Sequence, residues 1–184
     1  MEATRILREE HDVILRGLSV LSVMAAAGDR GELPPAQDAS DIVEFIRKFS
    51  DALHHHKEEG LLFPVMERAG FPRDGGPVGV MLAEHEEGRR LVSRAEAALA
   101  ETGSPADAAK AFGRAAGEFV VLMRNHIAKE NDILFNIADQ RIEEAAAAAL
   151  DMDFAEAVEA QAVGLQTQIA KLEALEARYL DAVA

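Results

Sequence analysis

Apolar residues recur every three or four positions along almost the whole chain, and no segment shows sustained alternation of apolar and polar residues. This spacing predicts amphipathic helices separated by breaks rich in glycine and proline. We expect helices at about residues 4–26, from Ser40 or Asp41 to just before Gly70, at 78–102, 105–139 and 153–181. Ser104 would cap the fourth helix, because serine is a good N-cap and Pro105 suits the first helical position.

The pattern of elements predicts an all-α protein. Four helices joined by short breaks are typical of an up-down-up-down four-helix bundle, here over residues 1–139. Residues 140–184 would form a C-terminal helical extension packed on the bundle within the same domain. The apolar residues of this extension could cover the bundle or support a dimer, so both a monomer and a homodimer stay open.

Composition removes several classes of function. The 184 residues include no cysteine, which excludes a disulfide scaffold, a zinc finger, a cysteine-bound iron–sulfur cluster and a thiol nucleophile. A net charge of −14, from 33 acidic and 19 basic residues, argues against nucleic-acid binding. The first residues lack the pattern of a signal peptide, and no apolar run approaches the roughly 20 residues that span a bilayer. We therefore expect a cytoplasmic protein with no membrane partner.

A short motif occurs twice, and it contains four of the six histidines. Its first part, Glu10-His11, recurs 74 positions later as Glu84-His85. Its second part recurs 72 positions later, so that His54, Glu58, Leu62 and Phe63 correspond to His126, Glu130, Leu134 and Phe135. Two elements that recur in the same order at nearly the same offset indicate an internal duplication.

The spacing within the motif places the polar side chains together. A histidine and a glutamate four residues apart lie on the same face of a helix. At a rise of ~1.5 Å per residue, His11, Glu58, His85 and Glu130 lie about 10 to 16 Å from the ends of their helices, and those ends share one side of an antiparallel bundle. The candidate metal ligands, which can therefore meet in one layer, are His11, His54, Glu58, His85, His126 and Glu130.

Imidazoles and carboxylates are poor core residues unless they pair or bind metal, because buried polar groups are costly. They suit iron, manganese or zinc, and two carboxylates can bridge two ions. The duplication therefore predicts a dinuclear site. The alternative is a set of surface histidines that pair with glutamates one helical turn away, which the duplication argues against.

These residues resemble the hemerythrin-like family, also called HHE cation-binding domains, over roughly residues 4–139. The resemblance is carried by Glu10-His11, residues 54–64, residues 79–86 and residues 126–135. It implies a four-helix bundle with a non-haem centre of two iron ions, Fe2+ or Fe3+, bridged by an oxo or hydroxo group. It also implies that His11 and His54 bind one iron and His85 and His126 the other, with Glu58 and Glu130 as bridges.

Two departures from the oxygen-carrying hemerythrins stand out. Met81 occupies the place of a histidine, and Asn131 the place of a bridging aspartate, with Glu130 one position earlier. One iron would then lose a nitrogen ligand and the site would become more symmetric, which argues against reversible oxygen carriage.

Several neighbours of the motif are candidates for the surroundings of the metal. Glu59 and Glu84 could hold ligand histidines or be solvated charges, while Met81, Phe63 and Phe135 would line the pocket. His55 and His56 follow His54 directly, and since an α-helix turns ~100° per residue they cannot both point where His54 points. Whether either contributes stays open.

The resemblance to bacterial members implies handling of peroxide, nitric oxide or iron. We expect a protein that binds or reduces a small oxidant, namely peroxide, dioxygen or nitric oxide. A catalase-like or peroxidase-like oxidoreductase is the most concrete form of this hypothesis. The alternative is a non-catalytic module that binds or senses dioxygen, nitric oxide or iron.

Overall fold

The computed structural model describes residues 1–101 and 103–180, which contain helices and no strand. The helices are α1 (Glu2–Asp29), α2 (Ala36–Phe45), α3 (Phe63–Arg68), α4 (Pro77–Ala100), α5 (Pro105–Lys129), α6 (Phe135–Arg141) and α7 (Glu144–Tyr179), with π-helical segments η1 (Ile46–His55), η2 (Glu58–Leu62) and η3 (Glu130–Leu134). The π-helical segments lie inside longer rods, so that α2 to α3 is one rod and α5 to α6 another. The all-α prediction is confirmed.

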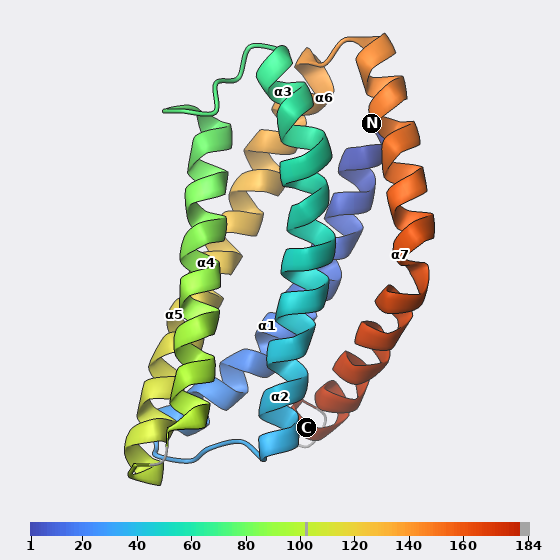
Figure 1. Ribbon diagram of the computed structural model, residues 1–184. Helices are drawn as coiled ribbons and strands as arrows, with labels where there is room; N and C mark the ends of the chain where they lie inside the picture. Colours follow the sequence, from blue (N-terminus) through green and yellow to red (C-terminus); the bar gives the residue numbers. More distant parts are fainter. Residues whose placement is uncertain (102, 181–184) are drawn as a thin grey trace.

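Consecutive rods run in opposite directions, as an up-down-up-down bundle requires (Figure 1). Within the bundle α5 packs against both α1 and α4. α7 then returns along the outside and contacts α1, α2 and the π-helical segments of the second rod. The extension therefore packs on the bundle along much of its length.

Two apolar clusters are separated by a polar layer. One cluster fills the half of the bundle that contains the C-terminal part of α1, and includes Ile14, Phe49 and Phe112. The other lies at the end that contains α3 and α6, and includes Leu7 and Phe135. The duplicated motif falls between them on every rod, so the candidate site lies inside the core.

The crossing of α1 and α5 depends on two glycines. A Cβ on Gly28 would lie 2.7 Å from the Cα of Gly113, and a Cβ on Gly113 would lie 2.8 Å from the carbonyl oxygen of Ala25. Real side chains do not tolerate such distances to backbone atoms. The absence of side chains at these positions therefore lets the two helices approach closely.

The predicted boundaries of some helices were wrong. The second helix begins at Ala36, after Pro35, rather than at Ser40 or Asp41. The last begins at Glu144 and includes the alanine run that precedes the predicted start at residue 153. The cap at Ser104 is confirmed, because its side chain accepts a hydrogen bond from the Asp107 amide. The predicted helix ends at residues 102 and 181 lie outside the described residues.

Among the described helices, α1 alone is long and apolar enough to cross a membrane, as judged by length and mean hydropathy. Half of its most apolar stretch is buried in the bundle, and core helices of ordinary globular proteins meet the same criterion. Its buried face also carries Glu10 and His11, which contact side chains of other rods.

Candidate metal centre

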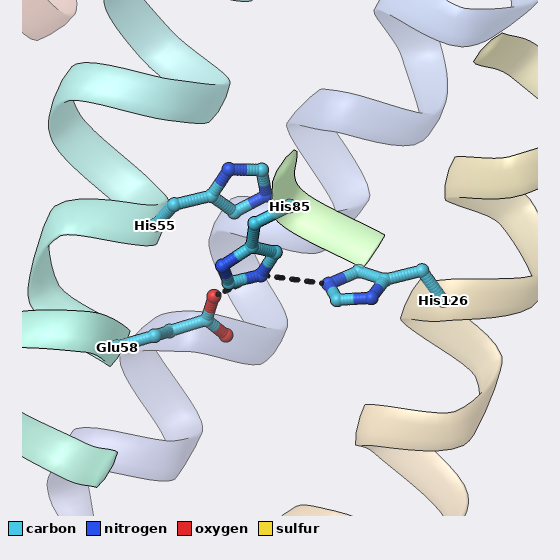
Figure 2. A group of neighbouring side chains, drawn as sticks. All are labelled: His55, Glu58, His85 and His126. Atoms are coloured by element: carbon cyan, nitrogen blue, oxygen red, sulfur yellow. Dashed lines mark hydrogen bonds and ion pairs between the residues drawn. The ribbon is translucent and has the colours of Figure 1, made fainter. Parts of the chain in front are cut away.

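The structure brings all six candidate ligands into one buried layer, where each is at most 1% exposed. Their donor atoms form two groups, and the atoms of each group lie within 4.8 Å of one another. The first group consists of His11, His54, Glu58 and Glu130. The second consists of His55, Glu58, His85 and His126, contributed by three different rods (Figure 2).

Both glutamates lie between the two groups. The two carboxylate oxygens of Glu58 face different groups, one 3.5 Å from His54 Nε2 and the other 3.4 Å from His85 Nε2. One oxygen of Glu130 lies 3.2 Å from His11 Nε2 and 3.2 Å from His126 Nε2. Each carboxylate therefore touches a histidine of both groups, which is the arrangement that a bridging ligand needs.

Sequence reasoning did not place His55 in the site. It assumed α-helical geometry, in which His54 and His55 point about 100° apart. The structure instead has a π-helix over η1, whose i to i+5 hydrogen bonds widen the turn and bring neighbouring residues closer in angle. Both side chains are buried, with ring centroids 5.5 Å apart, while His56 is exposed.

His55 changes the expected symmetry of the centre. Met81 was expected to leave one metal short of a nitrogen ligand, which would make the two sites alike. The ring of His55 instead stacks on that of His85, with centroids 3.8 Å apart, and adds a third imidazole to the second group. The groups therefore differ, with two histidines in the first and three in the second.

The four histidines of the repeated motif are each held by a hydrogen bond from Nδ1. His54 donates to Glu10, His126 to Glu84 and His85 to Glu59, at 2.8 to 2.9 Å. His11 donates to Asn131 Oδ1 at 2.8 Å. Such bonds fix the tautomer and direct Nε2 into the layer, where it can bind a metal. The Nε2 atoms of His85 and His126 lie 3.1 Å apart in this layer (Figure 2). Glu59 and Glu84, whose role was left open, therefore orient histidines.

These surroundings are duplicated as well. Asn131 lies 72 positions after Glu59, just as Glu84 lies 74 positions after Glu10. Lys57, which forms an ion pair with Glu10, likewise corresponds to Lys129, which pairs with Glu84. Asn131 was therefore detectable from the repeat, although it was noted only as a replacement for aspartate. The lysines differ in burial, because the Lys57 amine reaches Gln161 of α7 whereas Lys129 is partly exposed.

The chemistry of the buried layer fits a metal centre. Several of its polar atoms have no hydrogen-bond partner, namely His11 Nε2, His54 Nε2, both ring nitrogens of His55 and both oxygens of each of Glu58 and Glu130. Buried polar atoms normally have hydrogen-bond partners, so this group of unpartnered donor atoms indicates a site for metal ions. Burial, together with the charge of Glu130, raises the pKa of Glu58 well above its usual value. Burial and the neighbouring imidazoles lower the pKa of His54. Burial therefore favours the neutral form of both groups.

Apolar side chains close one side of the layer. The ring of Phe135 stacks on His11 with centroids 5.5 Å apart, and Phe63 lies 6.0 Å from His85. Met81, which is 3% exposed, belongs to the same apolar cluster as both phenylalanines. These residues lie where an apolar lining of the pocket was expected.

The chain is similar in sequence to proteins named for iron–sulfur cluster repair. YtfE of Enterobacter sp. (strain 638), an iron–sulfur cluster repair protein, is 27% identical over 135 residues, which cover 71% of this chain and 61% of that protein. Iron–sulfur cluster repair proteins YtfE of Yersinia pseudotuberculosis serotype IB (strain PB1/+) and Yersinia pestis (strain Pestoides F) are each 30% identical over 139 residues, with the same shares covered. The chain thus spans about three fifths of the length of these relatives.

No solved structure gives a significant match to the chain. The model of the hemerythrin HHE cation-binding domain matches residues 2–138, which include the bundle and all six predicted ligands. The buried histidines and glutamates are consistent with a two-metal site in such a domain. The chain belongs to the hemerythrin HHE cation-binding family.

Proposed function

We propose that the chain binds two iron ions in the buried layer and reacts with a small oxidant. The observation that carries this proposal is the pair of donor groups that share Glu58, with Glu130 in contact with histidines of both. The first ion would be held by His11, His54 and the two glutamates, and the second by His55, His85, His126 and Glu58.

The protein itself supplies position and exclusion of water. The hydrogen bonds at Nδ1 hold four imidazoles with Nε2 directed into the layer, so little rearrangement is needed on binding. The carboxylates, which are fully buried, would compensate the charge of the ions once metal binding displaces the proton of Glu58. Phe63 and Phe135 keep water from the imidazole faces they cover.

A pair of iron ions supplies reversible electron transfer and open positions for a small ligand. The favoured reaction is catalase-like, in which two molecules of hydrogen peroxide give two of water and one of dioxygen. Peroxide is both oxidised and reduced in this reaction, so no other reductant is required. A peroxidase-like reaction would differ only in drawing its electrons from another donor.

Oxygen evolution tests this proposal. The iron-loaded protein should release dioxygen from peroxide, and His54→Ala or His126→Ala should abolish the release because each removes an imidazole from the layer. His56→Ala is the matched control, since that histidine is exposed on the same rod. Equal release by wild type and both variants would contradict the proposed site.

A second candidate is non-catalytic handling of dioxygen, nitric oxide or iron. It is favoured by the relatives, whose name assigns them to iron–sulfur cluster repair. On this reading the chain would supply or sense iron rather than turn over peroxide. Reduction followed by exposure to air separates the alternatives, because reversible binding restores the starting spectrum on removal of oxygen and oxidation does not.

The proposed partner is thus a small oxidant, with neither nucleic acid nor membrane. A cytoplasmic location also stays a prediction, as does the choice between monomer and homodimer, which light scattering would settle.

A further inference from the structure

A small cavity lies beside the second donor group, between η1 and α4. Its volume is about 20 Å³, enough for roughly one or two non-hydrogen atoms. The residues that matter for its chemistry are Ser50, His55, His85, Gly88, Arg89 and Phe119. Since His55 and His85 belong to the second group, the cavity adjoins the candidate metal centre directly. We call it the Ser50 cavity.

The Ser50 hydroxyl and the ring nitrogens of His55, which line the Ser50 cavity, lack hydrogen-bond partners in the protein. The Ser50 side chain is 2% exposed and its hydroxyl oxygen makes no hydrogen bond. His55 is 4% exposed, and neither ring nitrogen makes a well-formed hydrogen bond, although Nδ1 lies 3.5 Å from Asp51. A buried hydroxyl without a partner is costly. The Ser50 hydroxyl is therefore available to a small polar molecule that enters the cavity.

The outer wall of the cavity is charged and reaches solvent. The Arg89 side chain is 34% exposed, and its guanidinium bonds to Asp51 Oδ1 at 2.9 Å through Nε and to Glu59 Oε1 at 2.7 Å. These contacts tie α4 to the second rod across the cavity. Arg47 also lines the cavity, and the apolar part of the wall consists of Ile46, Val92 and Phe119.

The internal duplication provides a comparison for this cavity. Gly88 corresponds to Ile14, 74 positions earlier, and His55 corresponds to Ile127, 72 positions later. Bulky apolar residues thus stand on the side of the first group, where Ile14 and Ile127 are buried. The first difference opens space and the second adds a polar ring, both beside the second group.

We propose that the Ser50 cavity binds a small uncharged molecule, of the size of nitric oxide or hydrogen peroxide, beside His55 and His85 on its way to the metal. Ser50 donates a hydrogen bond to this molecule, and Gly88 leaves the space for it. The proposal rests on the proposed two-metal function. It specifies from which side of the metal centre the ligand arrives and which residues select that ligand.

Gly88→Ala tests the proposal with little risk to the fold. A Cβ at Gly88 would lie 3.4 Å from Phe119 and 3.6 Å from Met123 Sδ, which is ordinary contact, and alanine favours the helix. The matched control is Gly117→Ala, because Gly117 lies within a neighbouring helix and a Cβ there meets no atom within 4 Å. Both variants should therefore bind iron and unfold at or above the temperature of the wild type.

The measurement is the association rate of nitric oxide with the reduced, iron-loaded protein in anaerobic stopped flow. Gly88→Ala and Ser50→Val, which fill the cavity from opposite walls, should each slow association by about tenfold, equivalent to ~1.4 kcal/mol. Gly117→Ala should match the wild type. Ser50→Ala keeps the space and loses the donor, so it should speed dissociation by roughly two- to tenfold.

The outcomes separate the two proposals. If the wild type and all variants bind iron and nitric oxide at the same rates, the cavity holds only water and the inference is overturned. If the wild type binds no iron, the two-metal function itself fails. Slower association in both filled variants, with unchanged iron content, supports the Ser50 cavity.

Discussion

The imidazoles of the centre differ in how firmly they are held. Four have Nδ1 fixed by a glutamate or an asparagine at 2.8 to 2.9 Å. His55 has only Asp51, at 3.5 Å, and the Asp51 carboxylate is already engaged by Arg89. His55 is thus the imidazole most free to turn within the layer, and the one whose role most needs a direct test.

His55→Ala should weaken one of the two metal-binding events and leave the other. The second donor group loses one of its three imidazoles, so we expect affinity there to fall at least tenfold, about 1.4 kcal/mol. Calorimetric titration with ferrous iron under anaerobic conditions measures both events. The neighbouring variant His56→Ala removes an exposed histidine and should titrate like the wild type. Identical titrations of the two variants would exclude His55 as a ligand.

Much of the site was predictable at this scale because the duplication specifies it. The repeat alone points to His11, His54, His85, His126 and both glutamates, and the structure brings them together. The same offset leads from Glu59 to Asn131. His55 was not predictable in this way, because its counterpart is Ile127 and only the backbone geometry turns it inward.

At the scale of elements, the departures from α-helical geometry coincide with the centre. η2 and η3 begin at Glu58 and Glu130, and η1 ends at His55. Apolar spacing predicts helices but does not distinguish α from π turns, since both repeat about every four residues. Helix existence was therefore predictable, whereas these local turns were not. π turns are frequent at functional sites, which agrees with their positions here.

The close crossing of α1 and α5 predicts that alanine substitutions at two glycines of α5 change the stability of the fold in opposite directions. Gly113→Ala should destabilise the fold by about 1 to 3 kcal/mol, because its Cβ would meet backbone atoms of α1 at 2.8 to 2.9 Å. Gly117→Ala should stabilise it by about 0.5 to 1 kcal/mol, since space is free there and glycine disfavours helices. Urea unfolding measures both changes, and a stabilised Gly113→Ala variant would contradict the described crossing.

At the scale of the whole molecule, α7 joins the two halves of the core. Leu150 and Phe154 belong to the cluster at the α3 and α6 end, while Leu172 and Leu175 belong to the other cluster. Between them Gln161 reaches Lys57, which pairs with the Glu10 that holds His54. The extension thus covers one side of the centre as well as the core, an arrangement that amphipathic spacing could suggest but not place.

The docking of α7 on α2 should depend on the ionisation of Tyr179. Its hydroxyl donates to Asp38 at 2.7 Å, and burial with the neighbouring Asp38 carboxylate raises the pKa of Tyr179 to about 12. A raised pKa means that the folded state favours the neutral phenol. The stabilisation is therefore complete below pH 10 and is lost as pH rises from 10 to about 12.

Tyr179 is the only tyrosine and the chain has no tryptophan, so tyrosinate absorbance reports this group alone. We expect it to titrate near 12 in the folded protein, and Tyr179→Phe to remove the corresponding loss of stability at high pH. If Tyr179 titrates near 10, and if Tyr179→Phe leaves the dependence of stability on pH unchanged, the hydrogen bond from Tyr179 to Asp38 does not form.

Iron content measures the central claim most directly. The protein should be loaded with ferrous iron, oxidised, freed of loosely bound metal and analysed for iron per chain together with its near-ultraviolet spectrum. We predict two iron ions per chain and the absorption of an oxygen-bridged ferric pair, because two donor groups share Glu58. Less than one equivalent of tightly bound metal, or a single ion without that absorption, would contradict a two-metal centre.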